Sequence, residues 1–444
     1  MVTRQYGKLL LLLAMLFVAV AGWPQAVVLS GTVTDASTGR PVDGASVTWG
    51  HVSVVTNDDG FFTLKNDVAG EQAVVSHVGY KSQRISAPAQ DQRIQLHPTT
   101  IQLQEVLVMA DNAREIVMTA ISKIPKNYST RPELFSCFYR ETTMKRQHYI
   151  SVAEGVVDMY KTGYTHGTGR DAVAIRKGRR LLSPRKGDTL SVKVTGGPVV
   201  PLMLDLVKNT EFLLNKKELD NYELTMEMPT TIAERSHYVV SIKPRCKQPY
   251  ALYYGQLYID QETLAFTRAE LTLDMSDRQK ATAMMLVRKP AGVRFRPKEL
   301  SCLIDYRYDE GVTRISYVRT TFRFNCDWRR RLFSTSFAAF CEMAVTGVSG
   351  VSGISGISGK SGTSGKSGLS GISGRDSFDQ RDAFFDKVDF FRDPAFWQDY
   401  NIIEPSERLD KAIGKLIKKY PTINDKQQTN TNNKNDRENR KDTV

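Results

Sequence analysis

Residues 31–80 read GTVTDASTGRPVDGASVTWGHVSVVTNDDGFFTLKNDVAGEQAVVSHVGY. Short runs of apolar and β-branched residues alternate there with glycine, proline, aspartate and asparagine. This spacing is typical of an all-β sandwich. The segment from Thr56 to Gly60 lies between two such runs, and its composition predicts a hairpin turn. A last strand of the sandwich is expected at Arg93 to Leu96.

Four ordered patterns within this region carry a family resemblance. They are G-x-V-x-D from Gly31, P-x-x-G-A-x-V from Pro41, T-x-x-x-G-x-F from Thr56 and V-G-Y from Val78. Residues 27–108 therefore resemble the carboxypeptidase regulatory-like domain, a transthyretin-like and Ig-like sandwich of seven strands. The resemblance implies a non-catalytic accessory domain, found beside carboxypeptidases and at the periplasmic N-terminus of outer-membrane transporters. Its motif positions here are Gly31, Asp35, Pro41, Gly44, Ala45, Val47, Gly60, Phe62, Gly79 and Tyr80.

Residues 1–26 have the pattern of an export signal. Arg4 and Lys8 precede an apolar run from Leu9 to Ala21, which is too short for a membrane span. Cleavage after Ala21 or Ala26 is expected, and an uncleaved anchor is the alternative. Since no cysteine lies near the expected cleavage sites, no lipoprotein anchor is indicated. The signal predicts an exported protein in the periplasm or on the periplasmic face of the outer membrane.

The net charge is +13 over 444 residues. An excess of lysine and arginine is the usual mark of phosphate binding, but export argues against a nucleic-acid partner. The clusters at 176–180 and 329–331 are expected to face anionic lipid head groups, acidic polysaccharide or simply solvent. Five cysteines without a C-x-x-C pair are too few for a disulfide scaffold, and the alternation around Cys302 predicts a buried core thiol.

Residues 109–345 are expected to form an α+β domain. One helix is predicted after Asp111 and Asn112, which can cap it, and before Pro125, which should end it. From His237 to Glu342 strong alternation predicts long antiparallel strands with one buried face. These strands resemble the curved half-barrel of lipoprotein-carrier proteins. The predicted fold class is thus mainly β, a seven-strand sandwich followed by an α+β domain with a curved antiparallel sheet.

The order of four further motifs resembles that of uncharacterised exported proteins with the same N-terminal domain. The motifs are FYRE at 138–141, GGP at 196–198, YYG-x-LYID at 253–260 and FW-x-x-YNIIEP at 396–405. A polar group inside an aromatic wall makes FYRE a candidate binding site; the alternative is an aromatic strand with one surface ion pair. The candidate binding residues are Phe138, Tyr139, Arg140, Glu141 and Asp260.

The C-terminal part divides into three segments. Residues 346–375 are a Gly/Ser repeat without proline, which predicts a flexible linker. Residues 376–423 hold an aromatic block and a helix from Ser406, with Leu409, Ile413 and Ile417 on one face, and are expected to dock on the middle domain. Residues 424–444 are polar and predicted to be disordered.

The sequence contains neither H-E-x-x-H nor G-x-S-x-G, and no histidine has a glutamate three positions on. We therefore expect no catalytic residue, metal or cofactor. The favoured hypothesis is a non-catalytic cell-envelope protein that binds an envelope protein or outer-membrane component. The alternatives are a carrier or sensor of lipid or another apolar ligand, and a hydrolase with an unrecognised site. A glycan ligand is also compatible with the sequence.

Overall fold

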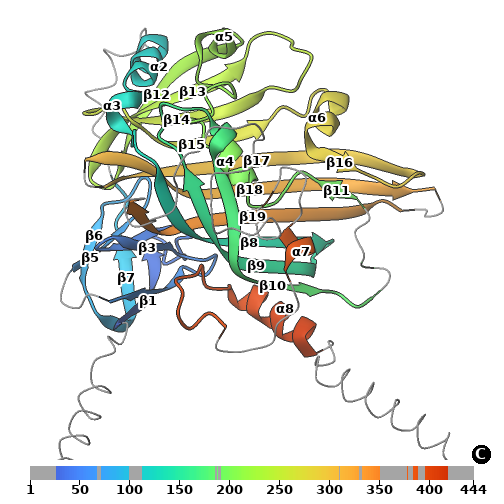
Figure 1. The fold of residues 1–444 in the computed structure, drawn as a ribbon, viewed down its shortest axis with the longest axis horizontal. Coiled ribbons are helices and arrows are strands. Elements are labelled where there is room, and N and C mark those ends of the chain that lie inside the picture. Colours follow the sequence, from blue (N-terminus) through green and yellow to red (C-terminus); the bar gives the residue numbers. More distant parts are fainter. Residues whose placement is uncertain are drawn as a thin grey trace, which may run out of the picture.

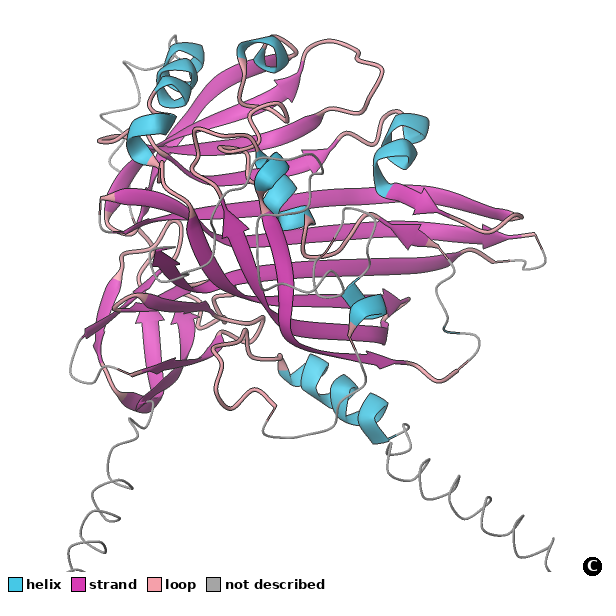
Figure 2. Cartoon of the chain, viewed as in Figure 1, coloured by secondary structure: helices cyan, strands magenta, loops and turns pink. Residues whose placement is uncertain are grey.

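The computed structural model describes residues 27–67, 72–99, 113–185, 188, 192–309, 311–329, 333–350, 378, 384–388 and 396–418. The expected signal peptide, most of the Gly/Ser repeat, the C-terminal tail and the helix-capping pair Asp111 and Asn112 lie outside these residues. The described chain is mainly β, as predicted (Figure 2). No helix among the described residues is long and apolar enough to cross a membrane.

The N-terminal domain is a sandwich of seven strands, which confirms the predicted architecture (Figure 1). One sheet has the order β4-β1-β7, with β1 antiparallel to β4 and parallel to β7. The other has the order β3-β2-β5-β6 and is antiparallel. The strands are β1 (Val27–Asp35), β2 (Ser46–Trp49), β3 (Val52–Val55), β4 (Phe61–Asn66), β5 (Gln72–Ser76), β6 (Gln83–Ser86) and β7 (Ala89–Leu96).

The family motif positions have structural roles in this sandwich. A side chain at Gly31 would collide with the carbonyl oxygen of Gln92, so only glycine lets β7 approach β1. The Asp35 carboxylate accepts hydrogen bonds from the backbone N–H groups of Ser37 and Thr38 and, at 2.6 Å, from the Tyr80 hydroxyl. The first and last motifs therefore hold one turn together.

The middle domain is built on one antiparallel sheet of ten strands, in the order β10-β9-β8-β19-β18-β17-β15-β14-β13-β12. The last strand, β19, pairs with the first, β8, and thereby joins two meanders. It runs to Gly350, beyond the predicted end near Val345, so the first residues of the repeat continue the strand. The strands are β8 (Glu133–Lys145), β9 (His148–Lys161), β10 (Ala172–Leu182), β12 (Tyr222–Ile232), β13 (Arg235–Pro244), β14 (Tyr253–Asp260), β15 (Phe266–Leu273), β17 (Val293–Asp309), β18 (Val312–Trp328) and β19 (Thr335–Gly350).

One face of this sheet, here called the inner face, is filled by the chain's own apolar side chains. Cys302 and Tyr139 lie on it with residues from the covering helices. The predicted helix ends before Pro125, which lies in the first turn of a second short helix, where proline is tolerated. The covering elements are α2 (Ala113–Ser122), α3 (Ile124–Asn127), η2 (Thr168–Arg170), α4 (Val200–Met203), α5 (Lys216–Leu219), α6 (Arg278–Met285), α7 (Phe384–Lys387) and the small ladder of β11 (Lys193–Val194) with β16 (Leu286–Arg288).

A buried ionic cluster fixes the segment after α4 on the inner face. Lys161 pairs with Asp205, whose other carboxylate oxygen accepts from the Tyr306 hydroxyl at 2.9 Å. Lys208 pairs with Asp171 at 2.7 Å. Both lysines are almost fully buried, so each requires its acidic partner to offset the loss of hydration.

The opposite, outer face of the sheet carries the sandwich and residues 396–418, here called the C-terminal strap (Figure 1). Helix α8 (Glu407–Lys418) buries Leu409, Ile413 and Leu416 against β9 and β10. All five cysteines are free thiols; Cys246 is exposed, and the other four are buried, which confirms the prediction for Cys302.

Candidate functional site

The FYRE motif lies in β8, where alternation sends its side chains to opposite faces. Phe138 and Arg140 face the C-terminal strap: the Phe138 ring lies 5.7 Å from that of Trp397, and Arg140 donates to the carbonyl oxygen of Ile403 at 2.6 Å. On the inner face, Glu141 accepts from the Tyr139 hydroxyl at 2.5 Å and from the Gly197 N–H at 2.7 Å. FYRE thus connects directly with the GGP and NIIEP motifs.

The alternative interpretation of FYRE, a surface ion pair between Arg140 and Glu141, is wrong, because the two side chains lie on opposite faces of β8. Arg140 is buried and pairs with Glu154 of β9 at 2.8 Å. Arg179 of β10 binds the other oxygen of the same carboxylate at 2.8 Å. Burial works to raise the pKa of Glu154, but the two guanidinium groups outweigh it and lower that pKa. In this structure the polar atoms of FYRE bind other segments of the chain. A ligand-binding role for these residues stays a prediction.

The basic cluster of β10 has internal partners. Arg176 pairs with Asp158, and Arg179 lies over the Trp397 ring, 5.4 Å from its centroid. The Lys177 ammonium lies 4.3 Å from the centroid of Phe396. A cation over an aromatic face is electrostatically favourable. This cluster therefore helps to hold the C-terminal strap and is more than a solvated basic face.

Asp260, the remaining candidate, ends β14 and organises the turn into β15. One carboxylate oxygen accepts from the Thr263 N–H at 2.7 Å, and the other from Arg235 Nε at 2.5 Å. Burial alone would raise its pKa, but the hydrogen bonds from Arg235 and Thr263 lower it to about 2. The carboxylate is therefore ionised at neutral pH and is a weak base.

Asp260 also lines a cavity of about 310 Å³ between the sandwich and the outer face of the sheet. The sandwich wall combines apolar residues, among them Val55 and Val74, with serine and threonine. The sheet wall supplies three arginines and two aspartates: Arg235, Arg268, Arg307, Asp260 and Asp305. A mostly apolar cavity with a few converging polar groups is the usual form of a small-molecule site.

Two histidines face this cavity from opposite walls, His77 from the sandwich and His237 from the sheet. His237 is only 1% exposed, and its Nδ1 lies 2.7 Å from the carbonyl oxygen of Arg235. Burial lowers the pKa of His237, and burial together with the charge of Arg268 lowers the pKa of His77 to about 4. Both rings are therefore neutral at pH 7.

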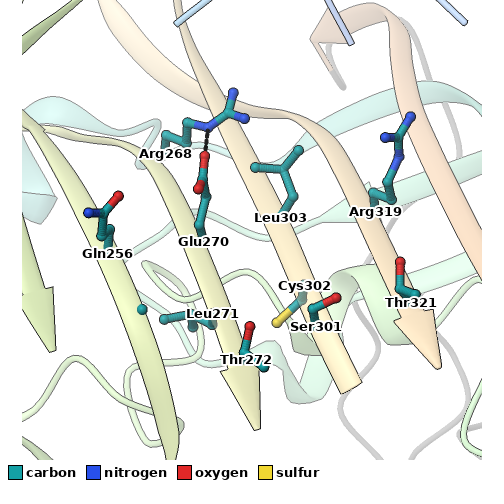
Figure 3. A pocket seen from close by; sticks show the side chains of 11 residues that line it. Gln256, Arg268, Glu270, Leu271, Thr272, Ser301, Cys302, Leu303, Arg319 and Thr321 are labelled. Atoms are coloured by element: carbon teal, nitrogen blue, oxygen red, sulfur yellow. Dashed lines mark hydrogen bonds and ion pairs between the residues drawn. The ribbon is translucent and has the colours of Figure 1, made fainter. Parts of the chain in front are cut away.

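A second, shallower cleft of about 460 Å³ lies on the same face (Figure 3). Gln256, Arg268, Glu270, Leu303 and Arg319 project from neighbouring strands into it (Figure 3). Arg268 is shared with the first cavity, and it pairs with Glu270 at 2.7 Å and Asp305 at 3.2 Å. The charges of this cleft are thus largely balanced within the protein.

Sequence reasoning found Asp260 but missed the residues that surround it. Arg268, Asp305 and Arg307 come from strands that the alternation had identified, on the face opposite to the core residues. The missing information was the order of the strands, which brings β13, β14, β15 and β17 together. Local sequence patterns do not predict the position of the sandwich over these strands either.

Comparison with solved structures finds distant likenesses. A DUF1329 family protein from Desulfovibrio piger has 9% identity and a TM-score of 0.24, covering 55% of this chain and 95% of its own. A LolA superfamily protein from Nitrosomonas europaea has 13% identity and a TM-score of 0.20, with 52% and 93% covered. A putative membrane-associated protein of unknown function from Bacteroides fragilis has 10% identity and a TM-score of 0.14, with 73% and 98% covered. Likenesses this distant assign neither a ligand nor an activity.

Comparison with curated proteins gives no match. A family model does match the N-terminal domain, over residues 29–108. The match agrees with the motifs of the sandwich and with its seven strands. Residues 29–108 are a CarboxypepD_reg-like domain, and a β-rich region follows them.

Proposed function

We propose that this protein is a non-catalytic binding protein of the cell envelope, and that its ligand site is the cavity between the sandwich and the sheet. The observation that carries the proposal is the composition of the cavity. Its lining is mostly apolar, yet it contains buried polar atoms without a hydrogen-bond partner among the described residues, His237 Nε2 and Arg307 Nη1. Such atoms are costly unless a ligand or water satisfies them.

Two observations favour binding over catalysis. The regulatory-like domain is an accessory module in the family that it resembles, and here it forms one wall of the cavity. Asp260, the candidate carboxylate, is held by Arg235 and Thr263 with a pKa of about 2, which suits a structural anchor better than a general base. The hydrolase hypothesis therefore ranks below binding.

The proposed location is the periplasm or the periplasmic face of the outer membrane, on the strength of the apolar run at Leu9 to Ala21. The ligand would then be another envelope component, and export argues against a nucleic acid. The lipid-carrier alternative remains compatible with this site. Because core side chains fill the inner face of the sheet, the apolar ligand of this alternative would lie in the cavity on the outer face.

Native mass spectrometry of the full-length protein purified from its own envelope tests the proposal. We expect a stoichiometric small-molecule adduct with the wild type. Val74→Trp should abolish the adduct, because the indole would fill the cavity from β5. Gln72→Trp, at an exposed position of the same strand, is the matched control and should retain it. A protein partner without a small molecule, bound equally by both variants, would show that the cavity is not the binding site.

A further inference from the structure

The tautomer of His237 determines what the cavity can recognise. Its Nδ1 lies 2.7 Å from the carbonyl oxygen of Arg235, which can only accept a hydrogen bond. Nδ1 therefore carries the proton, and in the neutral ring Nε2 presents a lone pair. Nε2 is buried, has no hydrogen-bond partner among the described residues, and lies 3.9 Å from the Asp260 carboxylate, which is also an acceptor. The position calls for a ligand group that donates, such as a hydroxyl.

Whereas His237 requires a ligand group that donates a hydrogen bond, Arg307 requires one that accepts. Arg235 is neutralised by Asp260, and Arg268 by Glu270 and Asp305. Arg307 has no ion pair within the described part of the chain, and its Nη1 is buried without an acceptor there. Burial lowers the pKa of Arg307, and the charge of Asp309 offsets this only in part. The half-buried guanidinium therefore gains from an acceptor at Nη1, and a carboxylate is its best geometric match.

The residues of the sandwich wall determine the polarity of the part of the ligand that does not reach the sheet. Val55, Val74 and Val78 line the cavity opposite the charged strands, interspersed with Ser46, Thr48, Ser53 and Ser76. A ligand that reaches the sheet with its polar end therefore lays its remaining atoms against valine side chains. Burial of this apolar surface would contribute to affinity without constraining the exact length of the ligand.

We infer that the cavity binds a small amphipathic hydroxy acid, with its carboxylate on Arg307, its hydroxyl donating to His237 Nε2 and its hydrocarbon chain against the valines of the sandwich. This inference rests on the proposed function, and it names the chemical class of the ligand. It requires no covalent step. It also explains why the cavity holds one unpaired cation and one unpaired acceptor, each of which the ligand would satisfy.

Isothermal titration calorimetry with three probes tests the inference on the full-length protein. The probes are 3-hydroxydecanoate, decanoate, which lacks the hydroxyl, and decane-1,3-diol, which lacks the carboxylate. With the wild type, loss of either group should weaken binding about tenfold, as expected for a hydrogen bond that leaves its buried partner unsatisfied. His237→Asn preserves a donor to the Arg235 carbonyl but has no acceptor at the position of Nε2, so it should bind 3-hydroxydecanoate and decanoate equally.

Arg307→Gln should in turn bind the acid and the diol equally. Because it removes a half-buried cation whose Nη1 has no acceptor among the described residues, the ligand-free variant should be at least as thermally stable as the wild type. Arg323→Gln makes the same charge change on the same sheet outside the cavity, and should leave binding unchanged. Lower stability of Arg307→Gln with unchanged binding would give that residue a structural role and overturn the inference.

Failure of the inference is distinguishable from failure of the proposed function. Tight binding of the diol that does not depend on Arg307 would refute the hydroxy acid while keeping the cavity as the site. No binding of 3-hydroxydecanoate by the wild type would also refute it. In that case the envelope adduct and its loss in Val74→Trp would still decide the proposed function.

Discussion

At the scale of single residues, His77 makes the stability of the protein depend on pH. The ring lies at the junction of sandwich and sheet, 5.5 Å from the Tyr80 ring, and burial and Arg268 lower its pKa to about 4. In the unfolded chain the pKa returns to about 6.5. Between these values the unfolded state binds more protons than the folded state, so stability falls as the pH falls.

We expect the free energy of unfolding to drop by about 2 kcal/mol between pH 7 and pH 5 on account of His77 alone. Asp260 adds nothing in this interval, because its folded and unfolded pKa values both lie below it. Urea titrations at several pH values measure the slope. His77→Gln should reduce it, and His148→Gln, at an exposed position, should not. An unchanged slope in His77→Gln would contradict the assignment.

The single residues also show what sequence reasoning can and cannot reach. Asp35 and Tyr80 were identified from an ordered motif, and the structure joins them by a hydrogen bond. Arg140 was singled out, but with the wrong partner. Alternation could place Arg140 and Glu141 on opposite faces, whereas the choice of Glu154 depends on the register of β8 with β9. That register depends on the whole sheet and cannot be predicted from a local sequence pattern.

At the scale of elements, Lys65 makes several of the hydrogen bonds that hold the C-terminal strap to the sandwich, beside those of Asn57 and Asp59. Lys65 of β4 donates from Nζ to the carbonyl oxygens of Trp397, Gln398 and Tyr400, at 3.1, 2.9 and 3.1 Å. Its backbone exchanges two further hydrogen bonds with the Asn401 side chain, at 2.7 and 2.9 Å. The three carbonyl oxygens thus all accept a hydrogen bond from the same ammonium group, that of Lys65.

Lys65→Met should therefore lower the free energy of unfolding by about 2 kcal/mol, since hydrogen bonds from charged donors are among the stronger ones. It should also speed hydrogen exchange in residues 401–409, where the strap meets the sandwich. Lys81→Met, at an exposed position of the same domain, is the control for loss of a lysine. Equal exchange in the two variants would mean that Lys65 does not anchor the strap.

Elements differ in how far the sequence predicts them. The apolar positions 409 and 413 predicted α8, because a helix with one apolar face needs only local periodicity. The extension of β19 to Gly350 was missed, since glycine and serine disfavour a strand locally. Pairing with β8 overrides that preference: Val348 and Ser349 are in register with Phe135 and Leu134. Tertiary pairing decided the end of this strand.

At the scale of the whole molecule, the ion pair of Asp43 with Arg319 couples the sandwich to the sheet. Arg319 of β18 binds both carboxylate oxygens of Asp43, at 2.5 and 2.9 Å, and also pairs with Glu342 at 2.9 Å. Arg319 and Asp43 are only partly exposed. A bidentate pair of this kind fixes orientation as well as distance.

A double-mutant cycle of Asp43→Asn and Arg319→Gln should give a coupling energy of about 1–3 kcal/mol in thermal or chemical unfolding. The exposed pair of Arg323 and Glu299 is the control, and its coupling should be under about 1 kcal/mol. Equal coupling energies for the two pairs would mean that the pair of Asp43 and Arg319 does not fix the sandwich on the sheet. The arrangement of the two domains could not be predicted from the sequence, because Asp43 and Arg319 are 276 positions apart.

The contact between Lys65 and Asn401 also bears on the order in which the protein is made. These residues are 336 positions apart, so the sandwich emerges from the ribosome long before the segment that covers it exists. Until then, Val55 of the sandwich and Phe138 of the sheet lack the cover of Ile402 and Ile403. A chain that loses its C-terminus would keep this apolar patch exposed near its N-terminal domain. Proteases and chaperones recognise exposed apolar surface of this kind. An unfinished or clipped molecule would therefore be recognised beside its N-terminal domain, although the missing residues belong to the C-terminal end of the polypeptide.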